Sequence, residues 1–355
     1  MIERRKGEQY DLAVAEAFAA GNAGWDDIEL VHDALPAVDA SEIDVTGTLM
    51  GRSLRLPLVI AGMTGGHARA LDVNRALAVA AEELGIAIGV GSQRAALRDP
   101  ALEPTYAVIR AEAPTAFIIG NIGISQLIDQ AREPALTRRE IERALAMVKA
   151  DALAIHLNFL EESVQPEGQT RARGIAAALQ ELARWSPVPI IAKETGAGIS
   201  RSVAERLRDL GIAGIDVGGL GGTSFAAIEA RRAEAAGDTA RAGLGKRFAT
   251  WGVPTSVSVL AVAGCGIETI ATGGVRSGFE AAKALALGAA VVGVGRPLLL
   301  AATEGPASIT RWVKQFELEL RTATFLSGTA RARDLRQVRR VIRGATRDWI
   351  DQLSY

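Results

Sequence analysis

Short apolar runs alternate with amphipathic helical patterns over most of this chain, and that alternation limits its fold more than any other feature. A run of this kind followed by a helical period is typical of a strand–helix unit in a parallel sheet, whose strands are buried on both faces. The sequence holds eight such runs, at residues 56–61, 86–90, 116–120, 152–159, 189–193, 214–217, 269–272 and 290–294.

Eight strand–helix units in roughly 250 residues predict an α/β protein with a closed (β/α)8 barrel rather than an open, doubly wound sheet. We expect a single domain over residues 1–355, with the barrel core at 51–304. A polar N-terminal arm with a helical stretch near residues 11–20 would precede the core within residues 1–50, and helices would follow it at 305–355. The charged, glycine-punctuated segment 231–250 predicts a mobile loop near the barrel mouth.

Local signals mark where several of the helices begin and end. A serine or threonine followed three residues later by glutamate is the capping box that starts a helix. The pairs that match it are Thr137 with Glu140, Ser202 with Glu205 and Ser277 with Glu280. A glycine at a helix end favours the left-handed conformation that stops the helix. The glycines predicted to do this, before the second, sixth and eighth runs, are Gly85, Gly211 and Gly288.

Composition excludes several classes of protein. The 355 residues carry a formal net charge of −1, so no global field would recruit nucleic acid. The N-terminus lacks the apolar core of a signal peptide, and the longest apolar stretches, 256–267 and 291–302, are too short or carry an arginine. The single cysteine, Cys265, cannot form a disulfide within the chain. We therefore expect a cytoplasmic protein without a membrane or nucleic-acid partner.

Polar residues stand at the ends of nearly all the predicted strands. Side chains alternate along a strand, so His156 and Asn158 share one face of the fourth run. Burying an unpartnered polar group costs roughly 2–7 kcal/mol, which makes such a ring hard to explain as packing. Enzymes with (β/α)8 barrels build their active sites at this end of the strands. The other members of the ring are Thr64, Ser92, Arg94, Asn121, Lys193 and Asp216.

The chemistry of this ring suits a phosphorylated ligand. Its hydrogen-bond donors are Ser92, Arg94, His156 and Asn158. Glu162, alone or with Glu161, offers oxygen ligands to Mg²⁺, although both also fit a solvated loop. Lys193 suits either the stabilisation of negative charge on a cofactor or an ion pair with Asp216 or Glu194.

A second anion-binding feature follows the last two runs. Residues 271–278 (ATGGVRSG) and 291–297 (VVGVGRP) each join a strand to a helix through glycines and an arginine, Arg276 or Arg296. Backbone N–H groups at such turns form an anion cradle, and (β/α)8 barrels hold cofactor phosphates after strands seven and eight.

Taken together, these motifs resemble type 2 isopentenyl diphosphate isomerases, the flavin-dependent form, over nearly the whole chain. MTGG and TGGVR also suit other FMN barrels, whereas HLN, VQPEG and GGTS in this order are more specific. The motifs are MTGG (63–66), GSQR (91–94), GNIG (120–123) with Gln126, HLN (156–158), VQPEG (164–168), KETGAGIS (193–200), DVGGLGGTSF (216–225) and TGGVRSG (272–278).

The resemblance implies an enzyme of isoprenoid biosynthesis that interconverts isopentenyl and dimethylallyl diphosphate, using Mg²⁺ and FMN reduced by NAD(P)H. It implies a homo-oligomer, a tetramer or an octamer. Matched position by position, the FMN contacts are Ala61, Gly62, Met63, Thr64, Ser92, Asn121, Lys193, Thr223, Gly273, Gly274, Arg276, Gly295 and Arg296.

The same matching gives the substrate and catalytic residues. Glu162 falls on the metal-binding glutamate. The substrate contacts are Arg5, Lys6, Ser92, Gln93, Arg94, His156, Asn158 and Glu161. The catalytic residues are His156, Asn158, Glu161 and Lys193.

The chain departs from the family pattern at two positions that face the substrate. Gln9 stands where the family has histidine, and it cannot carry a positive charge. Glu161 replaces a glutamine and places a negative charge beside the diphosphate; it could carry a proton, bind metal with Glu162, or indicate a different substrate. Phe225, where tryptophan is common, is a milder change.

Other functions remain open on the sequence. An FMN-dependent oxidoreductase such as a 2-hydroxy acid oxidase needs a histidine base near the sixth and seventh strands, and residues 216–225 contain none. Gln9 and Glu161 favour a diverged relative that binds, or acts on, a different phosphorylated substrate. A pure interaction scaffold would explain none of the polar strand ends.

Overall fold

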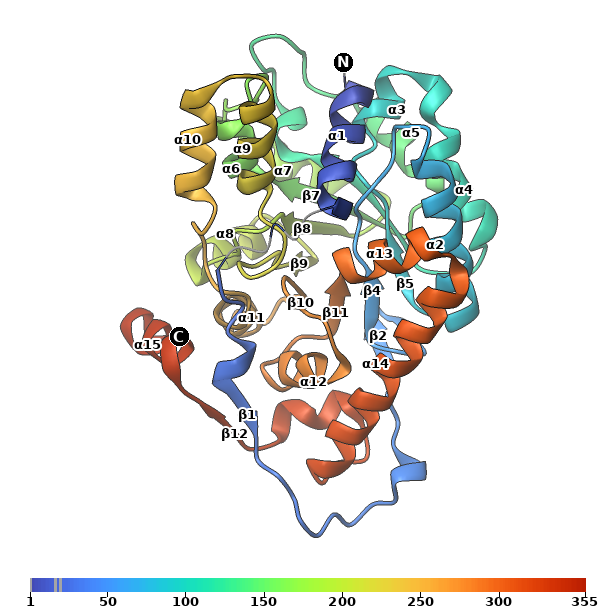
Figure 1. Cartoon of the computed structure of the whole chain (residues 1–355), viewed down its shortest axis with the longest axis vertical. Helices are drawn as coiled ribbons and strands as arrows, with labels where there is room; N and C mark the ends of the chain where they lie inside the picture. Colours follow the sequence, from blue (N-terminus) through green and yellow to red (C-terminus); the bar gives the residue numbers. More distant parts are fainter. Residues whose placement is uncertain (1, 16–17, 19–20) are drawn as a thin grey trace.

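The computed structural model describes residues 2–15, 18 and 21–355, and a closed eight-stranded parallel barrel lies at its centre (Figure 1). Neighbouring strands follow the order β10-β11-β4-β5-β6-β7-β8-β9 around it. Each strand coincides with one predicted run to within a few residues, which confirms the predicted fold. The strands are β4 (Leu58–Ile60), β5 (Ala87–Gly89), β6 (Ile118–Gly123), β7 (Ala152–Leu157), β8 (Ile190–Glu194), β9 (Gly214–Asp216), β10 (Glu268–Thr272) and β11 (Val291–Val294).

Helices surround the barrel and follow its strands along the chain (Figure 1). The helices of this outer layer are α2 (Ala70–Leu84), α4 (Pro104–Glu112), α5 (Arg138–Val148), α7 (Ile175–Trp185), α8 (Arg201–Asp209), α11 (Thr255–Ala263), α12 (Gly278–Ala286), α13 (Arg296–Glu304) and α14 (Pro306–Leu326). Shorter or additional helices lie in the connections: α3 (Arg94–Arg98), α6 (Phe159–Val164), α9 (Phe225–Ala235) and α10 (Thr239–Phe248).

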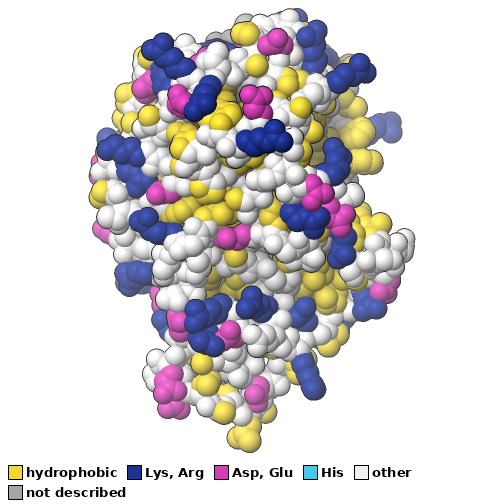
Figure 2. Space-filling view, turned by 180° about the vertical axis from the view of Figure 1, so that it is seen from behind, with side chains coloured by type: hydrophobic (Ala, Val, Ile, Leu, Met, Phe, Trp, Pro, Cys, Tyr) yellow, Lys and Arg dark blue, Asp and Glu magenta, His cyan; other side chains and the backbone are white. Residues whose placement is uncertain are grey.

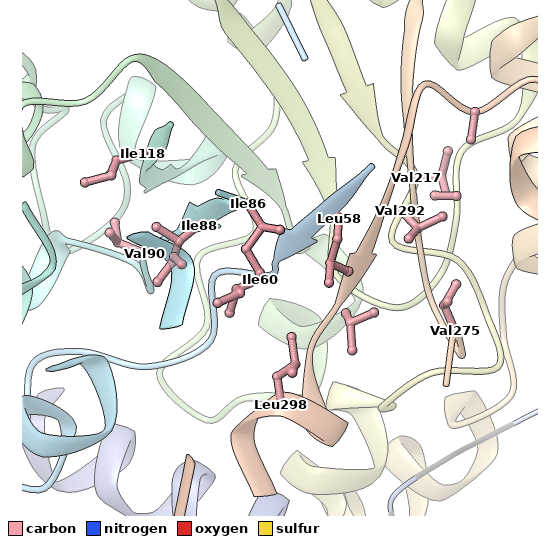
Figure 3. Packing of buried hydrophobic residues seen from close by; sticks show 14 of the residues in the cluster. Leu58, Ile60, Ile86, Ile88, Val90, Ile118, Val217, Val275, Val292 and Leu298 are labelled. Carbon is pink, nitrogen blue, oxygen red and sulfur yellow. The ribbon is translucent and has the colours of Figure 1, made fainter. Parts of the chain in front are cut away.

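Successive side chains of a strand point to opposite faces of the sheet, so the buried side chains form two clusters. One set of side chains, including Leu58 and Ile60 of β4, packs between the strands and the helices around them, as Figure 3 shows with Leu298 of α13 nearby. The other set fills the barrel interior and consists of Val59, Ala87, Phe117, Ile119, Ala152, Ala154, Ile191, Ile270 and Val291. The hairpin of β2 (Gly47–Leu49) and β3 (Arg52–Leu54) adds Leu49 and Leu54 to this interior cluster.

Most predicted helix ends are confirmed. Thr137 and Glu140 form a reciprocal capping box at α5. Ser277 accepts from the backbone N–H of Glu280 at α12, but the Glu280 carboxylate reaches the N–H of Arg276, one residue earlier than in a capping box. The glycines predicted to stop helices all have positive φ angles, at 62° for Gly85, 86° for Gly211 and 108° for Gly288.

The prediction that Ser202 caps α8 is wrong. The helix begins at Arg201, and Ser200 is the residue with the extended conformation of an N-cap. Ser202 already lies inside the first turn. Both Ser200 and Ser202 lie near the start of α8. The spacing of three residues between Ser202 and Glu205 resembles a capping box, and it led to the wrong choice of serine.

The prediction of a mobile loop at residues 231–250 is also wrong, because the segment forms the last part of α9 and all of α10. Gly237, with a φ of 76°, makes the turn between them, and the Asp238 side chain caps α10 by accepting from the N–H of Arg241. Charged residues that suggested a loop are paired along the helices, as Glu234 is with Lys246.

The N-terminal arm contains α1 (Ile2–Ala15), which begins earlier than predicted and contacts both α9 and α13. Positions 16, 17, 19 and 20 of the predicted helical stretch lie outside the described residues. Further along, β1 (Ile28–Leu30) pairs antiparallel with β12 (Arg340–Ile342), just before α15 (Gly344–Leu353). The helices predicted within 305–355 are present as α14 and α15, but the pairing of β12 with the arm was not predicted.

The surface carries mixed charge. On the face shown in Figure 2, basic and acidic side chains are interspersed, in keeping with the net charge of −1. Among the described residues, none of the helices combines the length and the apolar character that spanning a membrane requires.

Packing between strands and helices gives a test of the fold. Replacing the fully buried Ile60 by alanine removes apolar contacts and leaves a cavity, so we expect Ile60→Ala to lower the free energy of unfolding by about 2–5 kcal/mol. Chemical denaturation measures this loss. Leu318→Ala, at a position that is 59% exposed on α14, is the control and should change stability by no more than about 0.5 kcal/mol. A loss equal to that of the control would contradict the packing described.

Candidate active site

Four of the predicted polar residues form a continuous arc at the carboxyl ends of neighbouring strands. They are Asn121 of β6, His156 of β7, Lys193 of β8 and Asp216 of β9. The strand register places His156 beside Lys193 and Lys193 beside Asp216. The residues two positions earlier in β6, β7 and β8 belong to the barrel interior, so these side chains point into the barrel mouth.

The imidazole of His156 is neutral and its tautomer is fixed by Asn121. The Asn121 Nδ2 donates to the carbonyl of Val90 at 3.0 Å, which turns its Oδ1 toward the ring. That oxygen lies 2.8 Å from His156 Nδ1, so Nδ1 carries the hydrogen and Nε2 is left as an acceptor. Burial lowers the pKa of His156 to about 3, helped by the nearby charge of Lys6. The sequence had suggested a donor at this position; the ring can donate from Nε2 only after it gains a proton.

Lys193 pairs with Asp216, as one of the two sequence-based readings proposed. Its Nζ lies 3.4 Å from an Asp216 carboxylate oxygen and donates to the carbonyl of Glu194 at 3.1 Å. The Glu194 carboxylate is turned away from this pair. It accepts from the backbone N–H groups of residues 195–198, while burial raises its pKa to about 7. Glu194 therefore shapes the loop after β8 rather than neutralising Lys193.

Two carboxylates lie on α6, just after β7. Asn158 Nδ2 donates to Glu161 Oε2 and to Glu162 Oε1, each at 3.1 Å. The other oxygen of Glu162 accepts from the backbone N–H of Gln169 at 2.7 Å. Burial raises the pKa of Glu162, and the charge of Glu161 adds to the effect. The sequence-based alternative of a solvated loop does not hold for Glu162, which is buried.

Cations face these carboxylates from α1 and from α3. Arg5 Nη1 donates to Gln165 Oε1 at 2.9 Å, and Gln165 in turn donates to Glu161 at 2.7 Å. Burial and the charge of Arg5 lower the pKa of Lys6 to about 8. Arg94 is paired with Glu133, and its Nε is buried without a hydrogen-bond partner among the described residues. The arm thus brings two predicted substrate residues to the barrel mouth.

Two residues that sequence reasoning missed also reach this region. Glu229 of α9 is buried and accepts a hydrogen bond from Gln9 at 2.7 Å. His67 Nε2 lies 2.8 Å from Thr64 Oγ1, and burial lowers the pKa of His67 to about 4. Neither residue stands at a strand end or within one of the motifs. Both are contacted by α1: Gln9 bonds to Glu229, and the Tyr10 ring lies 5.2 Å from that of His67.

The GSQR segment divides its residues between the mouth and the scaffold. Ser92 is partly exposed, and its carbonyl accepts from the Tyr106 hydroxyl at 2.6 Å. Gln93 is fully buried: its Nε2 donates to the carbonyl of Ala144 at 2.7 Å and its Oε1 accepts from the N–H of Asn121 at 2.9 Å. These contacts hold α5 and β6 together, so we leave Gln93 out of the proposed substrate site.

Glycine-rich loops form the opposite side of the mouth, after β9, β10 and β11. A Cβ added at Gly222 would lie only 3.0 Å from the backbone nitrogen of Gly274, so the first two loops pack backbone to backbone. Arg276 bridges them by donating to the carbonyls of Gly221 at 3.1 Å and Gly274 at 3.3 Å. A cavity of about 310 Å³ lies beside this bridge. Its lining includes Asn22, Trp25, Gly221, Arg276 and Glu280.

The Arg296 side chain reaches the N-terminal arm. Its guanidinium donates to the carbonyl of Ala13 at 2.8 Å, at the end of α1. The backbone N–H groups at the start of α13, rather than this guanidinium, therefore face any phosphate bound after β11. A Cβ added at Gly295, just before α13, would lie 3.6 Å from Met63 Sδ, so the first and last strands of the barrel meet here.

Two buried polar atoms indicate that the mouth is built to receive a ligand. Among the described residues, Thr272 Oγ1 and Asn158 Oδ1 find no hydrogen-bond partner. Buried polar groups are almost always satisfied, and these two lie on the glycine side and on the carboxylate side of the mouth respectively. The described residues contain no cluster of three or more His, Cys, Asp or Glu with metal-binding geometry.

Comparison with known proteins now decides the family. Over 98% of its length the chain is 45% identical to an isopentenyl-diphosphate delta-isomerase of Methanoregula boonei, covering 96% of that protein. It is 41% identical to the enzyme of that name from Archaeoglobus fulgidus, covering 98% of each. The chain belongs to the isopentenyl-diphosphate delta-isomerase family. A family model described as FMN-dependent dehydrogenase matches residues 140–341 of this isomerase-family chain.

Solved structures agree on the barrel. Crystal structures of mandelate oxidase superpose on this member of the isomerase family, one of them with a TM-score of 0.63, 18% identity and coverage of 94% of this chain and 95% of the oxidase. At that identity the likeness shows the fold alone. The type 2 assignment made from the motifs is confirmed by the relatives and the FMN family model together. Which ligands the individual residues bind stays a prediction.

The neutral state of His156 can be observed directly, because the chain has only three histidines. With nitrogen-labelled histidine, we expect the His156 ring to show the neutral tautomer with hydrogen on Nδ1 at about pH 6, where an unperturbed histidine is largely protonated. Heteronuclear NMR gives this readout, and His156→Gln assigns the signal. Protonation of the ring at that pH would contradict the burial and the Asn121 contact.

Proposed function

We propose that this chain interconverts isopentenyl diphosphate and dimethylallyl diphosphate, using reduced FMN and Mg²⁺. The observation that carries the proposal is the pairing, at one barrel mouth, of a glycine-lined anion cradle with a separate cluster of cations and carboxylates. The names of the relatives supply the substrate class. Two phosphorylated molecules, a flavin and a prenyl diphosphate, suit the two halves of the mouth.

The flavin would lie against the glycine-rich loops after β9, β10 and β11. Two features suit it there: glycines leave the backbone of these loops uncovered by side chains, and the Thr272 hydroxyl has no partner among the described residues. When bound, the reduced flavin supplies an electron-rich, polarisable surface next to the substrate double bond. The residues we assign to FMN are Ala61, Gly62, Met63, Thr64, Ser92, Asn121, Lys193, Thr223, Gly273, Gly274, Arg276, Gly295 and Arg296, the last through its backbone.

The diphosphate would lie against the cations of α1 and α3. Arg5, Lys6 and Arg94 supply positive charge, and Ser92, His156 and Asn158 supply polar contacts, with Asn158 Oδ1 free for a ligand atom among the described residues. Glu162 would bind Mg²⁺ together with substrate oxygens, because Mg²⁺ usually takes one or two carboxylates plus phosphate. Clamping both ends of the diphosphate fixes the carbon chain and disfavours its loss as a leaving group.

The reaction moves one double bond by adding a proton to the terminal carbon and removing one from the carbon nearer the diphosphate. No net oxidation occurs, yet the positive charge that develops needs a dry, electron-rich site. Lys193, paired with Asp216, would stabilise negative charge on the cofactor side. Asn158 would hold Glu161 and Glu162 in place, and Glu161 would face the substrate carbons with His156 beside it.

The resemblance to the isomerase family also implies a reductant, a cellular location and an oligomeric state, which we propose together with this function. NAD(P)H would reduce the flavin, and the enzyme would act in the cytoplasm as a homo-oligomer, a tetramer or an octamer. Nucleic acid and membrane would not be partners. A second function, binding or conversion of a different phosphorylated substrate, is favoured only by Gln9 and Glu161, the positions that depart from the family pattern.

Isotope incorporation tests the reaction. With the chain loaded with FMN, reduced anaerobically and supplied with Mg²⁺ and isopentenyl diphosphate in D₂O, we expect deuterium in the dimethylallyl product, measured by NMR. A sample whose flavin stays oxidised is the control and should exchange far more slowly. Bound, reduced flavin with intact substrate and no exchange would favour the diverged relative instead.

Lys6 predicts the pH dependence of substrate binding. Its pKa is lowered to about 8, so the ammonium is charged below that pH and loses its charge as the pH rises through it. We expect the KM for isopentenyl diphosphate to rise about tenfold between about pH 7 and about pH 9.5, which corresponds to the loss of about 1.4 kcal/mol of attraction. Lys6→Arg keeps its charge over this range and should flatten the profile. An equal rise in KM for both proteins would exclude Lys6 as its cause.

A further inference from the structure

Two of the positions at which the chain departs from the family pattern are in contact. Gln9 Nε2 donates to Glu161 Oε1 at 3.0 Å, across 152 residues of sequence. Gln9 is buried, with an exposed fraction of 7%. Two unusual residues that meet in a direct hydrogen bond have to match each other chemically, because one must donate where the other accepts.

Glu229 fixes the direction in which Gln9 donates. The same Nε2 of Gln9 donates to Glu229 Oε1 at 2.7 Å, so both hydrogens of the amide group are directed at carboxylates. Glu229 is 2% exposed and is itself held by Arg232, whose Nη1 donates to its other oxygen at 2.6 Å. Rotating the Gln9 amide would point its oxygen at two carboxylates, so position 9 acts only as a donor.

The surroundings of Glu161 demand an acceptor in the same way. Gln165 Nε2 donates to Glu161 Oε1 at 2.7 Å, and Asn158 Nδ2 donates to Oε2 at 3.1 Å. With Gln9, three amide groups therefore present N–H to the two oxygens of this side chain. A glutamine at position 161 would offer one oxygen and one NH₂ group, and that NH₂ would face an N–H donor.

We propose that Gln9, locked by Glu229, is a positioning residue that holds Glu161 in its place at the mouth, and that positions 9 and 161 work as one matched donor–acceptor pair. The effect that we expect on kcat rests on the proposed function. The pairing predicts that a residue at position 9 without an N–H donor releases Glu161, whereas one that donates to both carboxylates keeps it in place. Gln9→Lys supplies N–H donors to Glu161 and Glu229, and Gln9→Leu supplies none.

The test compares three proteins: the unaltered chain, Gln9→Leu and Gln9→Lys, each loaded with FMN and Mg²⁺. We expect Gln9→Leu to lower kcat by about tenfold or more with KM changed by less than about threefold, and Gln9→Lys to stay within about threefold of the unaltered chain. Asp11→Asn is the matched control on α1, because Asp11 pairs with Arg69 in solvent, and it should leave kcat unchanged.

Hydrogen–deuterium exchange of the α1 amides gives a readout that needs no substrate. Gln9→Leu should speed exchange in α1 by about tenfold, and Gln9→Lys should not, since the contact docks α1. Activity of Gln9→Leu within about threefold of the unaltered chain, or equal losses for Gln9→Leu and Gln9→Lys in both measurements, would overturn the proposal. If the unaltered chain fails to isomerise while Gln9→Leu alone speeds exchange, only the proposed function falls.

Discussion

Barrel closure is the constraint on which the rest of this structure depends. In a closed parallel barrel, every second side chain points inward, and all strands present their carboxyl ends at one mouth. The lower inward positions are apolar and fill the interior, whereas Asn121, His156, Lys193 and Asp216 occupy inward positions near the carboxyl ends of β6 to β9. Because the strands are hydrogen-bonded neighbours, these four side chains meet at the mouth.

The N-terminal helix α1 adds polar and charged side chains to the candidate site at the barrel mouth. Without α1, the carboxylates of α6 and α9 would face solvent with fewer cations nearby; with it, Arg5 and Lys6 stand over them and Gln9 links Glu161 to Glu229. Arg296 holds the other end of this helix. Charge and hydrogen bonding therefore couple a terminal helix to a site formed by strands far away in sequence.

The sequence predicted the strands and the arc of polar residues well, because both follow from a period of two and from the parallel order of the strands. The sequence-based predictions failed where an element or a contact depends on local backbone geometry or on packing between segments that are far apart in sequence. Ser200 has the extended backbone that precedes α8, whereas Ser202 lies inside its first turn, and charges within residues 231–250 are paired on helices. Glu229, His67 and the pairing of β1 with β12 depend on contacts between remote segments, which no local pattern reveals.

We propose that one barrel mouth binds a flavin and a prenyl diphosphate side by side. A crystal structure of the chain with FMN, Mg²⁺ and isopentenyl diphosphate would test this binding. We expect the flavin phosphate at the backbone of residues 273–276 and 295–296, and the diphosphate between Arg94, Lys6 and Glu162. Electron density for either molecule away from this mouth, or a flavin whose ring does not approach Lys193, would contradict it.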